Sequence, residues 1–340
     1  MQLPLYAGID LHAKNNYLGI IDGEDRRILE KKLPNDLDTI LFNLNPFKED
    51  IVGVVVESTF NWYWLVDGLM KHGYSVHLAN PSAIKQYEGL KYTDDKWDSF
   101  WLAHMLRLNI LPEGYIYPSQ ERPLRDLLRK RLKLVREKTS HILSLKNLLS
   151  RNLGITVSSN NIETVREEYV EAKLTQPHLI MAAQASISIM KTLKNHIQII
   201  EKEVMSKISL REPFQSLLSV PGIGKILAFT IMLEIGDISR FKEVGNYSSY
   251  CRAVRTQRLS NGKNKGKGNV KNGNKYLSWA YIEAANFVKR YCPYARAFYQ
   301  RKANQGGNVL AIKALSNKLS RATYYIMRDN IEYDPKMLFG

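Results

Sequence analysis

Four carboxylates occupy positions from which a protein could bind divalent metal ions: Asp10, Glu57, Asp95 and Asp98. Asp10 and Glu57 each end a short apolar run, so both are predicted at the end of a β-strand. Asp95 and Asp98 are three residues apart at the start of a predicted helix and therefore share one face. Carboxylates that converge repel one another unless cations lie between them, and Mg²⁺ prefers oxygen ligands of this kind.

The chemistry that such a group supports is phosphoryl transfer. Two metal ions about 3.5–4 Å apart can stabilise both the attacking and the leaving oxygen. Taken alone, Asp10 fits a turn or cap residue equally well, whereas Glu57 closes a buried strand and so needs a partner. Asp94 is an alternative to Asp95 as a ligand, although the spacing to Asp98 favours Asp95. The histidines show no metal-binding spacing, so no histidine metal site is predicted.

A second candidate is the segment 219–225, which reads Ser-Val-Pro-Gly-Ile-Gly-Lys and precedes an apolar helical run. Helix, glycine turn and helix form the pattern of a helix-hairpin-helix. Gly222 and Gly224 would let backbone N–H groups approach a phosphate, and Lys225 would add an ion pair. The alternative is an ordinary glycine turn between two core helices. The pattern favours DNA or RNA contact.

The third candidate is a basic loop from Arg252 to Lys275, with eight Lys or Arg, four Gly, five Asn and no acid. Lysines and arginines there would neutralise phosphates. The predicted phosphate contacts are Arg252, Arg255, Arg258, Lys263, Lys265, Lys267 and Lys271. The three arginines recur every three residues and would form one edge of a helix.

Ser260 lies within this basic loop. On its residues alone it is best interpreted as a polar loop residue, because no general base accompanies it. A serine near arginines and a metal-bound phosphate could nevertheless act as a nucleophile. The sequence pattern leaves both interpretations open.

The elements that must position these residues begin with an α/β region. Strands are predicted at 6–10, 17–21 and 27–33, then a helix at 37–44, a strand at 51–57, a helix at 62–72, a strand at 74–79 and a helix at 97–109. Three antiparallel strands followed by strand, helix and strand is the order of the ribonuclease H-like fold. Residues 1–120 are therefore predicted to form the acidic domain.

Two long helices with little else follow. Residues 121–151 predict a basic amphipathic helix, and 178–208 resume the helical spacing, as in a helical hairpin or coiled coil. The basic helix is either a solvated face over a helical core or an arm that holds nucleic acid or a second protomer. We predict a helical region at 121–209 and a mainly helical C-terminal domain at 210–340.

Composition sets the class of partner. The chain has 340 residues, a formal net charge of +16 and 44% hydrophobic residues, so it can form packed cores and attract polyanions such as nucleic acid. An anionic membrane is disfavoured as partner because no apolar run is long enough to span a bilayer. Cys251 and Cys292 are expected to be small core residues, and the absence of a recognisable secretion signal favours the reduced cytoplasm.

Several short motifs, taken together and in order, resemble the DEDD insertion-sequence transposases. In the first half these are Gly-Ile-Asp at 8–10, Val-Val-Val-Glu-Ser-Thr at 54–59, Asn-Pro at 80–81 and Thr-Asp-Asp-Lys-Trp-Asp at 93–98. In the second half they are Val-Pro-Gly-Ile-Gly at 220–224 and the stretch from Ser260 to Leu277. The resemblance covers nearly the whole chain.

This resemblance implies a RuvC-like domain, a coiled-coil linker and a C-terminal transposase domain. It makes Asp10, Glu57, Asp95 and Asp98 the Mg²⁺ ligands, with Mn²⁺ as a possible substitute, and Ser260 the nucleophile that links covalently to DNA. It also implies donor and target DNA, a structured bridge RNA as guide, and assembly as a dimer or tetramer.

Two other functions fit the residues. A metal-dependent nuclease of the Holliday-junction type would use activated water, and the serine loop would only bind. A non-catalytic nucleic-acid-binding protein would retain the basic charge and have a degenerate acidic site. The leading hypothesis is a DNA transposase or recombinase that cleaves and rejoins strands.

Overall fold

The computed structural model describes residues 3–84, 95–254, 259–261, 263–266 and 272–339. Within these ranges, the description omits the side chains of Asp95, Lys96, Leu259, Ser260 and Asn264. The chain divides into two compact units, residues 1–119 with 256–272 and residues 120–255 with 273–340. Each unit is described by itself below.

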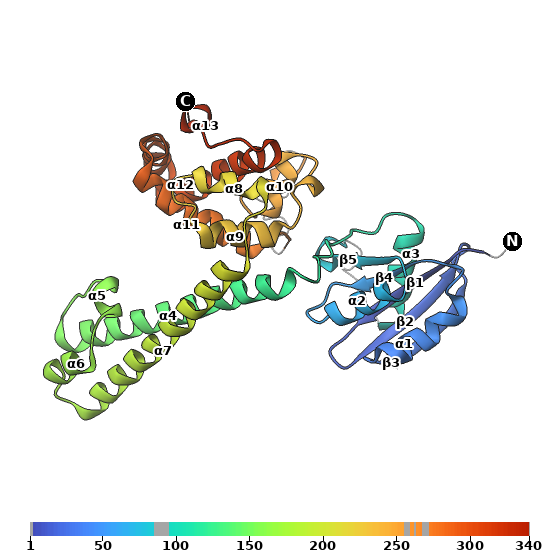
Figure 1. The fold of residues 1–340 in the computed structure, drawn as a ribbon, viewed down its shortest axis with the longest axis horizontal. Helices are drawn as coiled ribbons and strands as arrows, with labels where there is room; N and C mark the ends of the chain where they lie inside the picture. The colour runs from blue at the N-terminus through green and yellow to red at the C-terminus, as the bar shows by residue number, and fades with distance from the viewer. Residues whose placement is uncertain (1–2, 85–94, 255–258, 262, 267–271, 340) are drawn as a thin grey trace. The chain divides into compact units, whose positions relative to one another are not determined.

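The first unit is built on a five-stranded sheet (Figure 1). Its strands are β1 (Leu5–Leu11), β2 (Asn15–Asp22), β3 (Arg27–Pro34), β4 (Ile51–Glu57) and β5 (Val76–Ala79). The order across the sheet is β3-β2-β1-β4-β5. Strands β1 to β3 form an antiparallel meander, whereas β4 runs parallel to both β1 and β5. The predicted meander and strand–helix–strand order are confirmed.

Helices cover both faces of this sheet. Helices α1 (Leu37–Leu44) and α2 (Tyr63–Lys71) pack on one face, and α3 (Asp95–Arg107) packs on the other. Strand β4 shows why its sequence is almost continuously apolar. Val54 and Val56 join the core under α1 and α2, while Val55 joins the core under α3. Alternate side chains of a strand point to opposite faces, so a strand buried on both faces needs apolar residues throughout.

Short elements complete the first unit. The 3-10 turns η1 (Asn45–Phe47) and η2 (Pro81–Ala83) follow α1 and β5. The segment near Ser260 contains a short hairpin of two strands, β6 (Leu259–Ser260) and β7 (Lys263–Asn264), of two residues each. Asn261 takes a left-handed conformation at the hairpin turn, with φ of 52°. Asparagine adopts this left-handed conformation more readily than most other residues do.

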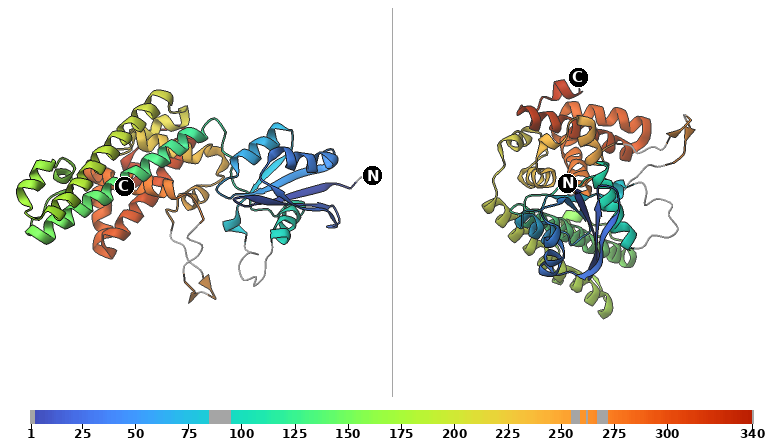
Figure 2. Two further views of the ribbon diagram at one scale, coloured as in Figure 1. Left: turned by 90° about the horizontal axis from the view of Figure 1, so that it is seen from below. Right: turned by 90° about the vertical axis from the view of Figure 1, so that its right-hand side faces the viewer.

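The second unit begins with a pair of long helices. Helix α4 (Arg122–Leu153) and helix α7 (Pro177–Lys207) pack along each other, joined by α5 (Ser159–Glu163) and α6 (Glu167–Lys173) (Figures 1 and 2). Proline in the first turn of each long helix, and left-handed Gly154 after α4, are typical helix-boundary residues. The two predicted long helices are confirmed, whereas α5 and α6 were not predicted.

Part of the positive charge of α4 is used inside the protein. Arg131 bonds to Glu201 of α7, and Lys138 bonds to Glu163 of α5. Arg125 and Arg129 both contact a buried glutamate that is described below. Lys130, Lys133 and Arg136 are exposed. Internal ion pairing therefore accounts for several of the basic residues that the sequence alone left available for nucleic acid.

The rest of the second unit is helical, as predicted. It contains α8 (Glu212–Gln215), η4 (Ser216–Ser219), α9 (Lys225–Ile235), η5 (Ile238–Arg240), α10 (Val244–Tyr250), α11 (Lys275–Tyr291), α12 (Pro293–Asp329) and α13 (Pro335–Phe339). Helix α12 is kinked at Gly307. Helix α9 is buried on all sides, which explains its almost wholly apolar sequence. Both cysteines are buried in the surrounding core, as expected.

The predicted helical edge of arginines is wrong where the structure describes it. Helix α10 ends at Tyr250, and Arg252 has a positive φ of 53°. A left-handed residue cannot continue an α-helix. Arg255 and Arg258 lie outside the described residues. Among the helices that the structure describes, none has the length and apolar character needed to cross a membrane.

Candidate active site

The sheet places Asp10 and Glu57 side by side. In the parallel pair of β1 and β4, Gly8 lies opposite Val55 and Ile9 opposite Val56, so Asp10 and Glu57 come next in register. Side chains two residues apart point to the same face. Asp10 therefore shares a face with Gly8, and Glu57 shares one with Val55, which is the face covered by α3. Asp10 is 2% exposed and Glu57 is half-buried.

Gly8 lets α3 approach this face closely enough to bring Asp98 into the site. A Cβ atom at Gly8 would overlap the backbone oxygen of Ser99 and lie 2.9 Å from the backbone nitrogen of Ala103. Its antiparallel partner Gly19 is similar, because a Cβ there would lie 2.8 Å from Ser99 Oγ. The two glycines form a smooth strip, which the backbone of α3 contacts at Gly8 and the side chains of Ser99 and Phe100 contact at Gly19. Asp98 immediately precedes Ser99, the residue of α3 that contacts both glycines.

The electrostatics of Glu57 show that the carboxylates converge. Its pKa is raised to about 8, first by burial and then by the hydrogen bond with Asp10 and the negative charges of Asp10 and Asp98. Like charges in a partly buried site disfavour ionisation. Without a cation, Glu57 therefore holds a proton at neutral pH and donates it to Asp10.

Three of the four predicted metal ligands are thus close in space, and their chemistry fits a hard divalent cation. A bound cation would relieve the repulsion that now raises the pKa of Glu57. Helix α3 begins at Asp95, as predicted, but the side chain of Asp95 and all of Asp94 lie outside the description. Within the described residues, no three His, Cys, Asp or Glu side chains already stand in metal-binding geometry.

His12 is a neighbour of the site that the sequence analysis missed. Its Nε2 lies 3.2 Å from Asp10 Oδ2. The backbone oxygen of His12 accepts hydrogen bonds from Asn35 Nδ2 at 2.9 Å and Asn61 Nδ2 at 3.1 Å, which hold the turn after β1 in place. The signal was present in the sequence, because His12 follows Asp10 by two residues, immediately after the end of β1.

The structure describes only part of the predicted serine loop. Ser260 lies in β6, with its backbone paired to Lys263 of β7. Lys263 and Lys265 are exposed and accessible to phosphate. Arg252 instead donates from Nε to the backbone oxygen of Gly273 at 3.0 Å, so it closes the base of the loop. The predicted contacts Arg255, Arg258, Lys267 and Lys271 lie outside the described residues.

The glycine turn before α9 has a structural explanation for one of its two glycines. Gly222 has a positive φ of 99°, and a Cβ there would lie 2.6 Å from the Cβ of Phe287 in α11. Its close approach is therefore to the protein's own helix. Gly224 has open space around it and precedes exposed Lys225 at the start of α9. These two residues keep the predicted phosphate contact possible.

Comparisons with known proteins agree with this arrangement. Residues 7–152 match a family model described as a transposase of the DEDD IS110 type, and residues 215–300 match one described as the transposase IS116/IS110/IS902 family. A relative, the transposase for insertion sequence element IS1328 of Yersinia enterocolitica, is 24% identical over 286 residues. The alignment covers 80% of this chain and 83% of that relative.

An acidic α/β unit in the first matched region, followed by a helical unit in the second, defines a DNA transposase, an enzyme of DNA recombination whose partner is DNA. The chain belongs to the IS110-type DEDD transposase family. The resemblance inferred from the short motifs is therefore confirmed at the level of the family.

Replacing Gly8 with alanine tests the close packing of α3. The added methyl group meets backbone atoms that cannot move aside, so Gly8→Ala is expected to destabilise the first unit by about 1–3 kcal/mol. Gly23→Ala is the matched control, because its Cβ would meet Pro4 at an ordinary 3.4 Å. Urea unfolding of both variants gives the comparison. Equal stability of Gly8→Ala and Gly23→Ala would contradict the close contact.

Replacing Glu57 with glutamine tests the raised pKa. The pKa of Glu57 is about 8 in the folded protein and 4.5 for an ordinary glutamate, so the folded state holds the extra proton between these values. The metal-free wild-type protein should therefore lose stability as the pH rises from about 4.5 to about 8. Glu57→Gln should remove this dependence and raise the melting temperature at pH 8 more than at pH 5. Parallel pH profiles of the two proteins in a chelator would contradict the assignment.

Proposed function

We propose that this transposase cuts and rejoins DNA strands by way of a covalent bond between Ser260 and DNA. The observation that carries the proposal is the convergence of Asp10, Glu57 and Asp98 at one edge of the sheet, in a chain that belongs to a DEDD transposase family. The strand order of the first unit supports a RuvC-like fold. The packed pair of α4 and α7 supports the coiled-coil linker, and the turn before α9 supports the helix-hairpin-helix.

Asp10, Glu57 and Asp98, together with Asp95, would hold Mg²⁺, or Mn²⁺ in its place. When bound, the metal supplies positive charge to the scissile phosphate. The residues of the chain hold and release a proton and keep the site in position. Glu57 gives up its proton as the site fills, and His12, with the two asparagines that hold its backbone oxygen, keeps the turn beside Asp10 in place.

Ser260 Oγ would attack the scissile phosphorus. A bond forms between Oγ and phosphorus, the bond from phosphorus to the leaving DNA oxygen breaks, and the hydroxyl proton of the serine passes to solvent or to the leaving oxygen. The new phosphodiester retains the energy of the old one, so the strand can be rejoined without ATP. Exposed Lys263 and Lys265 lie within five residues of Ser260 and would neutralise phosphates of the bound strand.

Ser260→Ala tests the nucleophile. With Mg²⁺ and DNA carrying the element ends, the wild-type protein should form a protein–DNA adduct that survives denaturing electrophoresis. Ser260→Ala should lower adduct formation by at least about a thousand-fold, and Asp10→Asn should also abolish it. Ser186→Ala is a matched control, because the hydroxyl of this half-exposed serine donates to the backbone oxygen of Ala182 in its own helix. Free cut ends from an active Ser260→Ala protein would show that water is the nucleophile and contradict the proposal.

The guide is proposed to be a structured bridge RNA from the same element, held by exposed basic residues of the helical unit. Sequencing the RNA that copurifies with the protein tests this part. A single structured RNA from the flanks of the element is expected. Random RNA fragments, released at about 0.5 M salt, would contradict guidance and indicate binding by charge alone.

A further inference from the structure

The loop that carries Ser260 is closed at its base by hydrogen bonds between its two ends. Asn274 N donates to the backbone oxygen of Tyr250 at 2.6 Å, and Arg252 Nε donates to the backbone oxygen of Gly273 at 3.0 Å. Gly273 has a positive φ of 86°, and a Cβ there would lie 2.7 Å from the oxygen of Tyr250. The path of the chain into and out of the loop is therefore fixed on both sides.

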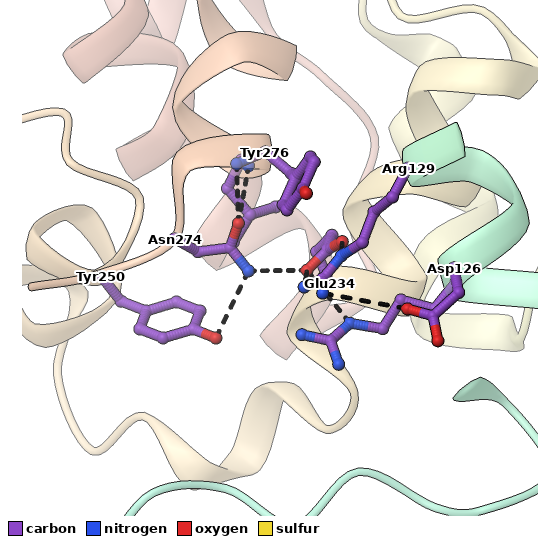
Figure 3. Close-up of polar contacts among 8 residues, drawn as sticks. Asp126, Arg129, Glu234, Tyr250, Asn274 and Tyr276 are labelled. Carbon is purple, nitrogen blue, oxygen red and sulfur yellow. Dashed lines mark hydrogen bonds and ion pairs between the residues drawn. The ribbon is translucent and has the colours of Figure 1, made fainter. Parts of the chain in front are cut away.

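One of these end residues, Asn274, also bonds to a carboxylate in the centre of the helical unit (Figure 3). Its Nδ2 donates to Glu234 Oε2 at 2.7 Å, while its Oδ1 accepts from the backbone nitrogens of Tyr276 and Leu277. Asn274 thus caps α11 through its Oδ1 and binds the carboxylate of Glu234 through its Nδ2. It is itself 7% exposed.

Glu234 is held on its other side by two arginines of α4. Arg129 donates from Nε to Oε1 at 2.6 Å and from Nη2 to Oε2 at 2.8 Å, and Arg125 Nε lies 3.1 Å from Oε2. The guanidinium of Arg129 also lies 4.3 Å from the ring centroid of Tyr276. Glu234 is 2% exposed and is the sole acid of α9.

The electrostatics explain how this glutamate stays charged. Burial opposes its ionisation, but the Arg129 hydrogen bond, both arginine charges and the Asn274 hydrogen bond outweigh burial and lower the pKa of Glu234. A buried ion pair is seldom a strong net stabiliser compared with apolar packing, whereas its geometry is strict. The cluster is therefore better suited to fixing positions than to adding stability.

We propose that Glu234 and Asn274 are positioning residues that hold the base of the Ser260 loop in the orientation needed for nucleophilic attack. The inference rests on the proposed function of Ser260. Through Arg125 and Arg129, the same cluster fixes the loop base to the first turns of α4. Neither Glu234 nor Asn274 contacts DNA in this scheme. Both act on the ends of the loop, where Asn274 bonds to Tyr250 and Arg252 bonds to Gly273.

Two variants loosen the loop base in different ways. Asn274→Ser keeps a good helix N-cap but is too short to reach Glu234. Gly273→Ala leaves Glu234 and Asn274 intact but strains the left-handed turn and crowds the oxygen of Tyr250. Asp126→Asn is the matched control, because Asp126 is half exposed and lies 3.9 Å from Arg129.

The experiment uses the full chain with its copurified RNA, Mg²⁺ and DNA carrying the element ends. It measures DNA affinity, melting temperature and the rate of adduct formation at saturating DNA. Asn274→Ser and Gly273→Ala should each slow adduct formation by about ten- to a hundred-fold with DNA affinity unchanged. Asp126→Asn should match the wild type in all three measurements.

Two outcomes overturn the inference. Adduct formation at the wild-type rate in both variants would show that the loop base does not position Ser260. A joint fall in adduct rate, DNA affinity and melting temperature would show a purely structural role. Failure of the proposed function looks different, because Ser260→Ala would then still cut the DNA, and the inference would fall with it.

Discussion

The candidate active site depends on the contact between the backbone of α3 and the glycine strip of β1 and β2. Strands β1 and β4 fix Asp10 and Glu57 by hydrogen-bonded register, but Asp98 comes from a helix that has no such register with the sheet. Because Gly8 and Gly19 have no side chains, Ser99 can contact the sheet. Asp98, the residue before it in α3, is thereby brought close to Asp10 and Glu57. A site assembled in this way combines carboxylates from three elements far apart in sequence.

Glu57 and Glu234 lie in opposite electrostatic environments. Glu57 is partly buried among other carboxylates, so its pKa is raised and its charged form is disfavoured. Glu234 lies between two arginines and an asparagine, so its pKa is lowered and its charge is satisfied within the chain. The first environment suits reversible binding and chemistry, and the second suits a permanent joint between helices. The same type of side chain thus belongs to the candidate active site in one unit and to a cluster of ion pairs in the other.

The sequence predicted those features that depend on local patterns. The alternation of β1 to β3, the continuous apolar run of β4 and the helical spacing of α4 and α7 are each visible in a short window, and strand ends gave Asp10 and Glu57. The Glu234 cluster was missed because its partners lie 40 to 109 residues away along the chain. One signal was available, since a single acid in the otherwise mostly apolar run 226–235 needs buried partners.

The predicted helical conformation at Arg252 was wrong for a related reason. A spacing of three residues says nothing about whether the backbone is helical, and the bond from Arg252 to Gly273 favours a turn at that point. The glycine turn at Gly222 was interpreted either as an approach to phosphate or as an ordinary turn between core helices, and the sequence pattern favoured phosphate. The contact with Phe287, 65 residues later in the chain, shows that tertiary packing can require the same glycine.

The central claim is that Asp10, Glu57 and Asp98 converge to bind a divalent cation. Crystals of the protein soaked in Mn²⁺ test it most directly, because the anomalous signal of manganese locates the ion without assumptions about its ligands. We expect a peak within about 2–2.5 Å of oxygens from all three residues. A map with no peak among these carboxylates, or with manganese bound only elsewhere, would contradict the account.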